Sequence, residues 1–173
     1  AAHILFPQFI KGAHQVVVPV GIDQDPFIRL TRDVAESFKF KKPSALHAKF
    51  VPSLQGGDKM SSSEQGNIFL SDNEIEVKNK INKYAFSGGQ ATLEEHKKKG
   101  GNPDIDVSFQ YLKIFFEEDD KKIADIEKDY KSGKLTTGEL KKYTIEKINA
   151  FLKEHQKRKK EAKKHVDKFL FKS

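Results

Sequence analysis

The chain has 173 residues, 36% of them hydrophobic and 33% charged, and a formal net charge of +7. No apolar run reaches the length that spans a bilayer, so we expect a soluble protein with no membrane partner. The absence of cysteine excludes disulfides and thiolate metal sites, and the six histidines form no HxH or HxxxH pair, so we predict no metal site.

The first predicted elements are a strand and a helix. Residues 15–20 form a nearly continuous β-branched run ended by Gly21, which is typical of a strand buried on both faces of a parallel sheet. Asp25 before Pro26 predicts an N-cap and a first helical turn, so a helix should cover about 26–38. Its buried stripe should consist of apolar residues spaced by three and four, namely Phe27, Leu30, Val34 and Phe38.

A second strand is expected from Leu46 to Val51, where alternate residues are apolar, and it should end at Pro52. Strand, helix and strand make one crossover of a doubly wound sheet, in which ligands bind beyond the carboxyl ends of the strands. The loop at 21–25 and the loop at 56–63 both follow such ends. We therefore expect these two polar loops to meet one ligand.

The loop after the first strand contains Gly21, Asp23, Gln24 and Asp25. A glycine lets a ligand approach the strand end, a carboxylate can accept two ribose hydroxyls, and an amide can both donate and accept. For Asp25 we favour helix capping, whereas for Asp23 capping is the alternative to ribose binding.

The stretch from Gly56 to Gly66 combines three glycines with Lys59 and three consecutive serines. Glycine supplies the backbone freedom that a moving or ligand-contacting loop needs. A lysine ammonium, serine hydroxyls and exposed backbone N–H groups can together hold a phosphate. The alternative is a surface turn whose serines cap the next helix. Composition alone favours that turn.

From Ser71 onward the pattern changes to helices. Capping boxes are predicted at 71–74, 92–95 and 136–139, and Asp106 can cap a further helix. The helices are expected at 72–85, 92–99, about 107–117, around 123–130 and from near 138 onward. The helix at 107–117 should contribute core residues: Val107, Tyr111, Ile114 and Phe115.

The stretch from Lys153 to Lys172 carries 9 basic and 3 acidic residues, an excess that equals nearly all of the net charge. Such a stretch suits a polyanionic partner, because clustered lysines and arginines neutralise phosphates. It is equally typical of the solvated face of a terminal helix.

Several strings, in an unchanged order, resemble one enzyme family. Lys59–Ser63 resembles the lysine-methionine-serine-lysine-serine signature of class I aminoacyl-tRNA synthetases. From residue 1 into the last helix, the chain is similar to the tryptophanyl-tRNA synthetases of the eukaryotic and archaeal type. The other strings that carry this resemblance are Gly21–Phe27, Thr31–Val34, Leu46–His47, Ala85–Gly89, Asp106–Phe109 and Thr137–Lys142.

The resemblance implies a ligase that joins L-tryptophan to ATP, normally with Mg²⁺, and then transfers the acyl group to tRNA(Trp). In the first step the tryptophan carboxylate attacks the α-phosphorus in line, so catalysis consists of positioning and charge stabilisation. The family's enzymes are cytoplasmic homodimers, and no DNA partner is implied.

The resemblance also assigns roles to individual residues. Lys59 would hold the departing pyrophosphate, and Met60 would offer its backbone to the adenine. Phosphate contacts are implied for Ser61 and Ser62. Gly21 and Asp23 match the ribose-facing loop, and Gln24 matches a residue near the α-amino group of tryptophan. The loop between the glycines would close over ATP.

The implied fold is α/β plus all-α. Residues 1–72 would form the carboxyl-terminal part of a Rossmann-like catalytic domain that includes the serine stretch, and residues 73–173 would form a helical anticodon-binding domain. Ser62 departs from the family pattern, which often has a second lysine there. No histidine-isoleucine-glycine-histidine motif is found, because His3-Ile4 is followed by Leu5-Phe6. We therefore expect a carboxyl-terminal fragment that is inactive alone.

Two alternatives remain. The tyrosine-specific sister family shares the fold and the serine loop, but Asp25-Pro26-Phe27 and the string at 86–89 favour tryptophan. The other alternative is a non-catalytic RNA-binding or signalling fragment built around residues 73–173.

Overall fold

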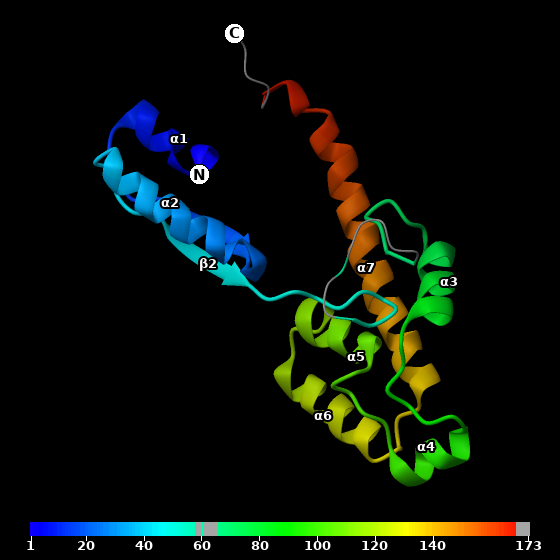
Figure 1. Ribbon diagram of the computed structural model, residues 1–173. Coiled ribbons are helices and arrows are strands. Elements are labelled where there is room, and N and C mark those ends of the chain that lie inside the picture. The colour runs from blue at the N-terminus through cyan, green and yellow to red at the C-terminus, as the bar shows by residue number, and fades with distance from the viewer. Residues whose placement is uncertain (58–59, 61–65, 169–173) are drawn as a thin grey trace. The chain divides into compact units, whose positions relative to one another are not determined.

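The computed structural model describes residues 1–57, 60 and 66–168 (Figure 1). The chain divides into two compact units, Ala1–Val51 and Pro52–Ser173. The predicted domain boundary at 72/73 lies inside the second unit. The described residues of the serine stretch, Gly56, Gly57, Met60 and Gly66, therefore fall in the same unit as the helices that follow them. Compactness does not test where the catalytic domain ends, so that boundary stays a prediction.

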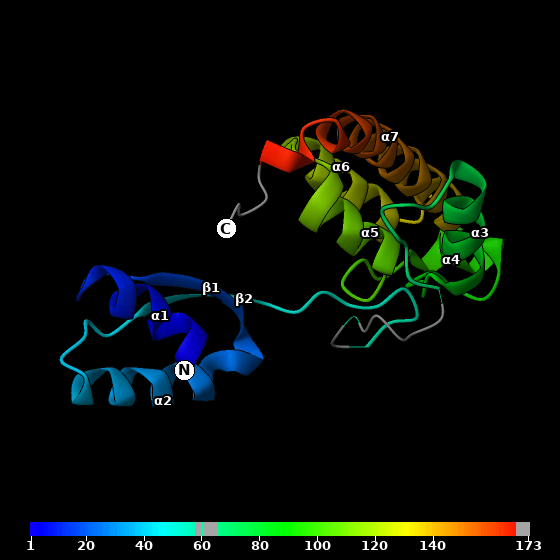
Figure 2. The same ribbon diagram turned by 90° about the horizontal axis from the view of Figure 1, so that it is seen from above.

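The first unit is a strand–helix–strand crossover preceded by a helix. Its elements are α1 (Ala2–Lys11), β1 (Val17–Gly21), a 3₁₀ turn (Ile22–Gln24), α2 (Asp25–Ser37) and β2 (Ser44–Ala48). The two strands are parallel, with Val17 opposite Ser44 and Gly21 opposite Ala48. Figure 2 shows α2 running alongside both strands. The predicted crossover is confirmed, although β2 ends earlier than expected.

The predicted buried stripe of α2 is wrong. The buried residues of α2 are Ile28, Thr31 and Ala35, whereas Phe27 and Leu30 are 59% and 58% exposed. Both sets have the three-and-four spacing of a helix face, so periodicity alone could not choose between them.

The predicted burial of the first strand on both faces is also wrong. Val17 of β1 and Leu46 of β2 are 67% and 66% exposed. Alternate residues of β1 are only half-buried. Among the described residues of this unit, therefore, one face of the two-stranded sheet is left without a covering layer.

The second unit is helical (Figure 1). Its elements are α3 (Glu74–Tyr84), α4 (Leu93–Lys99), α5 (Val107–Tyr111), a π-helical turn (Leu112–Phe116), α6 (Asp120–Lys131), α7 (Thr137–Lys163) and a 3₁₀ turn (Val166–Lys168). α3, α5 and the π-helical turn all pack against α7. The predicted helices are thus confirmed in order and approximate length. Each described helix is too short or too polar to cross a membrane.

Three of the four N-caps predicted in this unit are confirmed, although at 92–95 only the hydrogen bond to the Thr92 side chain is made. The hydroxyls of Thr92 and Thr136 accept from the backbone N–H groups of the residues three positions later, and Asp106 caps α5. The box at 71–74 is wrong, because Asn73 is the N-cap of α3 and Glu76 completes its box. Asparagine caps as well as serine does, so the box is displaced by two residues.

A buried polar network supports the core of this unit. Phe109, Leu112, Ile123, Tyr130 and Leu140 form the central cluster. The Tyr130 hydroxyl donates to Asp106 at 2.8 Å, and the fully buried Asp106 also accepts from the Gly88 backbone at 2.9 Å. Burial raises the pKa of Tyr130 to about 12. The turn at 88, the start of α5 and the end of α6 are thereby joined.

The helix predicted at 107–117 holds two of its four expected core residues. Val107 and Tyr111 are buried, but Ile114 and Phe115 are half-exposed. The Glu117 N–H donates to the Leu112 carbonyl at 2.9 Å, five residues back, so the last turn is wider than an α-helical turn. This widening changes which side chains face the core.

Candidate functional site

The loop at the carboxyl end of β1 presents the predicted ribose-facing residues to solvent. Gly21 is the last residue of β1, and Asp23 and Gln24 lie in the 3₁₀ turn that follows, both exposed. A Cβ built on Gly21 would lie 2.9 Å from Asp23 Oδ1 and 3.4 Å from a ring carbon of Phe50. The missing side chain of Gly21 therefore makes room for the Asp23 carboxylate against the end of the strand.

Asp25 is not the helix cap that the sequence predicted. Gln24 occupies the N-cap position and makes no side-chain capping hydrogen bond. The Asp25 carboxylate instead pairs with Arg29 at 2.6 Å and lies 3.2 Å from His47 Nε2. The preceding 3₁₀ turn shifts Asp25 into the helix, where its side chain points to a partner one turn on.

The contact between His47 and Asp25 was not predicted from the sequence. His47 lies on β2, opposite Val20 of β1, and reaches the first turn of α2 through Asp25. This contact fixes the start of α2 to the neighbouring strand and so holds the loop between them. The spacing of Asp25 and Arg29 was a visible signal for their ion pair. Nothing in the sequence pattern joined Asp25 to His47.

The serine stretch is described only at its two ends and at Met60. Gly56 and Gly66 have φ values of 87° and 94°, a region that favours glycine. A Cβ on Gly66 would also lie 2.7 Å from the Tyr84 ring. The need for glycine at these ends is thus confirmed. Lys59, Ser61 and Ser62, the predicted phosphate-binding residues, lie outside the described residues, as does Ser63.

The turn at Ser87–Gln90 is tied to the rest of the helical unit. The Ser87 hydroxyl accepts from the Gly89 N–H at 3.0 Å, and Gln90 Nε2 donates to the Gly100 carbonyl at 2.9 Å. A Cβ on Gly88 would lie 1.9 Å from the Asn102 carbonyl oxygen. These contacts fix the backbone of the turn. The lysines at 97–99, which end α4 and follow this turn closely in the sequence, are exposed.

The basic excess near the carboxyl end of the chain is partly neutralised within α7. Lys157, Lys159 and Lys160 are exposed, but Arg158 pairs with Glu154 at 2.7 Å. Beyond the helix, Lys164 pairs with Glu161 at 2.8 Å. The free positive charge of this stretch is therefore smaller than its composition indicates.

In the described part of the chain, no three acidic or histidine side chains converge as a metal site would require. A magnesium ion that keeps most of its water and binds through substrate phosphates needs few protein ligands.

Comparison with known proteins places these features in a family context. Residues 9–153 match the family model of the class I tRNA synthetases for tryptophan and tyrosine. The tryptophan–tRNA ligase of Sulfurisphaera tokodaii is 57% identical over 157 residues, which cover 90% of this chain and 41% of that protein. The human cytoplasmic tryptophan–tRNA ligase is 49% identical over 167 residues, or 94% of this chain and 35% of that protein.

Solved structures of tryptophanyl-tRNA synthetases also match this chain. The tryptophanyl-tRNA synthetase of Aeropyrum pernix superimposes with a TM-score of 0.85 at 37% identity, over 94% of this chain and 45% of that one. The enzyme of Giardia lamblia gives 0.78 at 40% identity, over 91% and 40%. The chain thus spans about two fifths of the length of the relatives that it matches.

Proposed function

Because this chain belongs to the class I tRNA synthetases for tryptophan and tyrosine, we propose that it is part of a tryptophan–tRNA ligase. The observation that carries the proposal is the match over residues 9–153, together with tryptophan–tRNA ligases 57% and 49% identical to this chain. The enzyme would join L-tryptophan to ATP and then pass the acyl group to tRNA(Trp).

In this proposal the loop after β1 binds the nucleoside and the amino acid. The Asp23 carboxylate accepts hydrogen bonds from the ribose hydroxyls, and Gly21 keeps the strand end open for the sugar. The Gln24 amide lies toward the α-amino group of tryptophan. Support comes from the exposure of both side chains and from the close fit of Asp23 against Gly21. Hydroxyl recognition by a carboxylate at a strand end is common in nucleotide-binding sheets.

The serine stretch would act on the phosphates. Lys59 stabilises the charge that develops on pyrophosphate as it leaves, Ser61 and Ser62 hydrogen-bond phosphate oxygens, and the Met60 backbone contacts adenine. No protein nucleophile is needed, because the substrate carboxylate attacks the α-phosphorus directly. The protein's contribution is then positioning and electrostatic stabilisation. Mg²⁺ would arrive with ATP, and we assign it no protein ligand.

We assign tRNA binding to the helical residues 73–173 and the catalytic role to residues 1–72. The likeness to a cytoplasmic ligase supports action in the cytoplasm. We also propose that the full-length enzyme is a homodimer without membrane or DNA partners. The exposed lysines of α7 suit the phosphates of tRNA.

The test is amino-acid-dependent ATP–pyrophosphate exchange by the full-length enzyme that contains this chain. We expect exchange with tryptophan and little with tyrosine. An enzyme that exchanges faster with tyrosine would belong to the sister specificity, and one that exchanges with neither would overturn the proposal.

A further inference from the structure

The helical unit contains an apolar cavity, and of its lining residues only Met60 takes part in the proposed reaction, through its backbone. The cavity has a volume of about 320 Å³ and is lined by residues from the serine stretch, the segment before α3, the π-helical region and α7. The lining residues are Met60, Ile68, Phe69, Leu70, Tyr111, Phe115, Phe116, Ile148, Phe151 and Leu152. All of them are apolar or aromatic, and none is charged.

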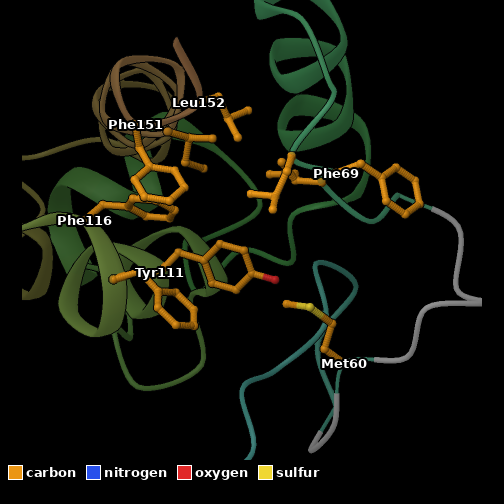
Figure 3. A pocket seen from close by; sticks show the side chains of 10 residues that line it. Met60, Phe69, Tyr111, Phe116, Phe151 and Leu152 are labelled. Atoms are coloured by element: carbon orange, nitrogen blue, oxygen red, sulfur yellow. The ribbon is translucent and has the colours of Figure 1, made fainter. Parts of the chain in front are cut away.

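Aromatic rings form one wall of this cavity. Figure 3 shows the side chains of Tyr111, Phe116 and Phe151 gathered on one side, with Met60 pointing toward Tyr111 from the other. Phe116 and Phe151 meet edge to face at 5.7 Å, and Tyr111 and Phe115 do so at 6.1 Å. Rings arranged in this way offer faces and edges on which another flat ring can stack.

Hydrogen bonds outside the cavity hold its walls in place. Gln156 of α7 donates to the carbonyls of Leu70 and Asp72, both at 3.0 Å, and so fixes the segment before α3 against the helix. The Tyr111 hydroxyl donates to the Pro52 carbonyl at 3.0 Å. A preformed cavity binds a ligand without the entropic cost of ordering its walls.

The cavity is open to solvent although its lining is apolar. Phe115 and Phe151 are 52% and 50% exposed, and Leu70 and Met60 are 52% and 41% exposed. A ligand that covers these side chains would remove apolar surface from water. The volume lies at the lower end of the range for small-molecule sites, whereas a partner helix, about 10 Å across, needs a longer groove.

We propose that this cavity is a binding site for a small, uncharged aromatic molecule of two or three rings. Such a ligand would stack on the ring wall formed by Tyr111, Phe116 and Phe151. Its other face would contact the Met60 thioether, a favourable partner for aromatic rings. The ligand is distinct from ATP, tryptophan and tRNA, which carry charges that this lining does not match. The side chains that line the cavity have no role in the proposed reaction, so binding here can be tested separately from that reaction.

The composition of the chain supplies a direct probe. Met60 is the only methionine, and the chain has no tryptophan. The ε-methyl carbon of Met60, labelled with ¹³C, gives a single resonance that needs no assignment. Titration with N-phenyl-1-naphthylamine, an uncharged fluorescent aromatic, should shift that resonance by ring current. The emission of the probe should rise along the same binding curve.

Three variants of the full chain distinguish binding in the cavity from nonspecific binding of the probe to other apolar surfaces. Phe151→Ala removes one wall and should weaken the probe roughly tenfold, in line with the loss of one aromatic contact and its buried area. Leu70→Trp fills the cavity and should abolish binding. Phe38→Ala is the matched control, because Phe38 is 51% exposed in a separate aromatic cluster with Phe9 and Phe40. It should bind as the parent does.

Melting curves followed by circular dichroism confirm that each variant is folded. The proposal is overturned if the probe leaves the Met60 resonance unmoved, if Leu70→Trp binds like the parent, or if Phe38→Ala weakens binding as much as Phe151→Ala. It is also overturned if the probe fails to bind and the Met60 resonance moves on dilution. That result would identify a second copy of the chain as the occupant.

Discussion

Gly21 and Asp23 show how one absent side chain can position another. Replacing Gly21 with alanine puts a Cβ 2.9 Å from Asp23 Oδ1, so the carboxylate must move. The backbone is not strained, since the φ of Gly21 is −67°. We therefore expect Gly21→Ala to raise the KM for ATP in the full-length enzyme without lowering its melting temperature.

Asp23→Ala should raise the same KM roughly tenfold, the order of one lost hydrogen bond to a charged group. If displacement of the carboxylate explains the glycine variant, the double variant should be no worse than Asp23→Ala alone. Gly138→Ala, where the added Cβ meets nothing within 4 Å, is the control. Independent, additive effects of the two changes would separate Gly21 from Asp23.

Lys59 should matter for the rate of adenylate formation and little for tryptophan binding. Its charge is needed most when pyrophosphate departs, so Lys59→Ala should cost on the order of 3 kcal/mol, roughly a hundredfold in rate. Single-turnover kinetics in the full-length enzyme measure this step, with Lys98→Ala as an exposed-lysine control. A rate close to that of the parent would remove Lys59 from the pyrophosphate site.

At the scale of elements, Glu117 joins the end of the π-helical turn to α6 and α7. Its carboxylate accepts from the Tyr143 hydroxyl and pairs with Lys147 at 3.0 Å and Lys122 at 3.4 Å, and its side chain is only 6% exposed. The hydrogen bond from Tyr143, followed by that from Lys147, lowers the pKa of Glu117 from 4.5 to about 2.

Because the folded-state pKa is lowered, the stability contributed by Glu117 is fully present above about pH 4.5 and is lost as the pH falls toward about 2. Glu117→Gln should therefore lower the melting temperature at neutral pH, and its difference from the parent should shrink through that window. The exposed neighbour variant Glu118→Gln is the control. A difference that stays constant from pH 7 to pH 2 would contradict this assignment.

Local elements could be predicted because their signals are local. The caps at Thr92, Asp106 and Thr136 are set by residues three apart, and the crossover followed from a β-branched run and two helix-start residues. The face that α2 buries could not be predicted, since it depends on distant neighbours. The π-helical turn likewise ends at Glu117, whose ion pair with Lys147, far along the chain, no local pattern could predict.

The candidate site was predictable only in part for the same reason. The exposure of Asp23 and Gln24 follows from their place in a loop after a strand, as the sequence indicated. The contact between Asp25 and His47 joins elements whose register only the structure fixes. The roles of Lys59, Ser61 and Ser62 stay predictions.

For the whole molecule, burial is unequal between the two compact units. Among the described residues, Leu5, Ile28 and Ala35 are the buried hydrophobic residues of Ala1–Val51, and the others belong to Pro52–Ser173. Amides in β1 and β2 should therefore exchange with deuterium faster than amides in α6 and α7, because fewer buried contacts oppose their opening. Hydrogen-exchange mass spectrometry on the full chain tests this. Equal protection would mean that the exposed strand face is covered in solution.

In the helical region, we expect the residues that give affinity for tRNA to differ from those that recognise its bases. Phosphate contacts give affinity without sequence information, whereas base reading needs directional donors. Neutralising Lys157, Lys159 and Lys160 should weaken cognate and anticodon-swapped tRNA alike, and lower the salt slope by roughly 0.7 to 0.9 for each phosphate that is no longer neutralised. Arg158, already paired with Glu154, should contribute less. An unchanged salt slope would show that these lysines form a solvated helix face and do not contact tRNA.

Substitution in the turn at 87–90 should act differently, by reducing discrimination between the two tRNAs. Gln90 is the exposed member of that turn, so Gln90→Ala removes an amide near the surface. Because its Nε2 also donates to the Gly100 carbonyl, the variant must first melt as the parent does. Binding of both tRNAs across a salt series then decides its role. If only the affinity for the cognate tRNA falls, Gln90 recognises bases. If the affinities for both tRNAs fall equally, Gln90 serves only to stabilise the turn.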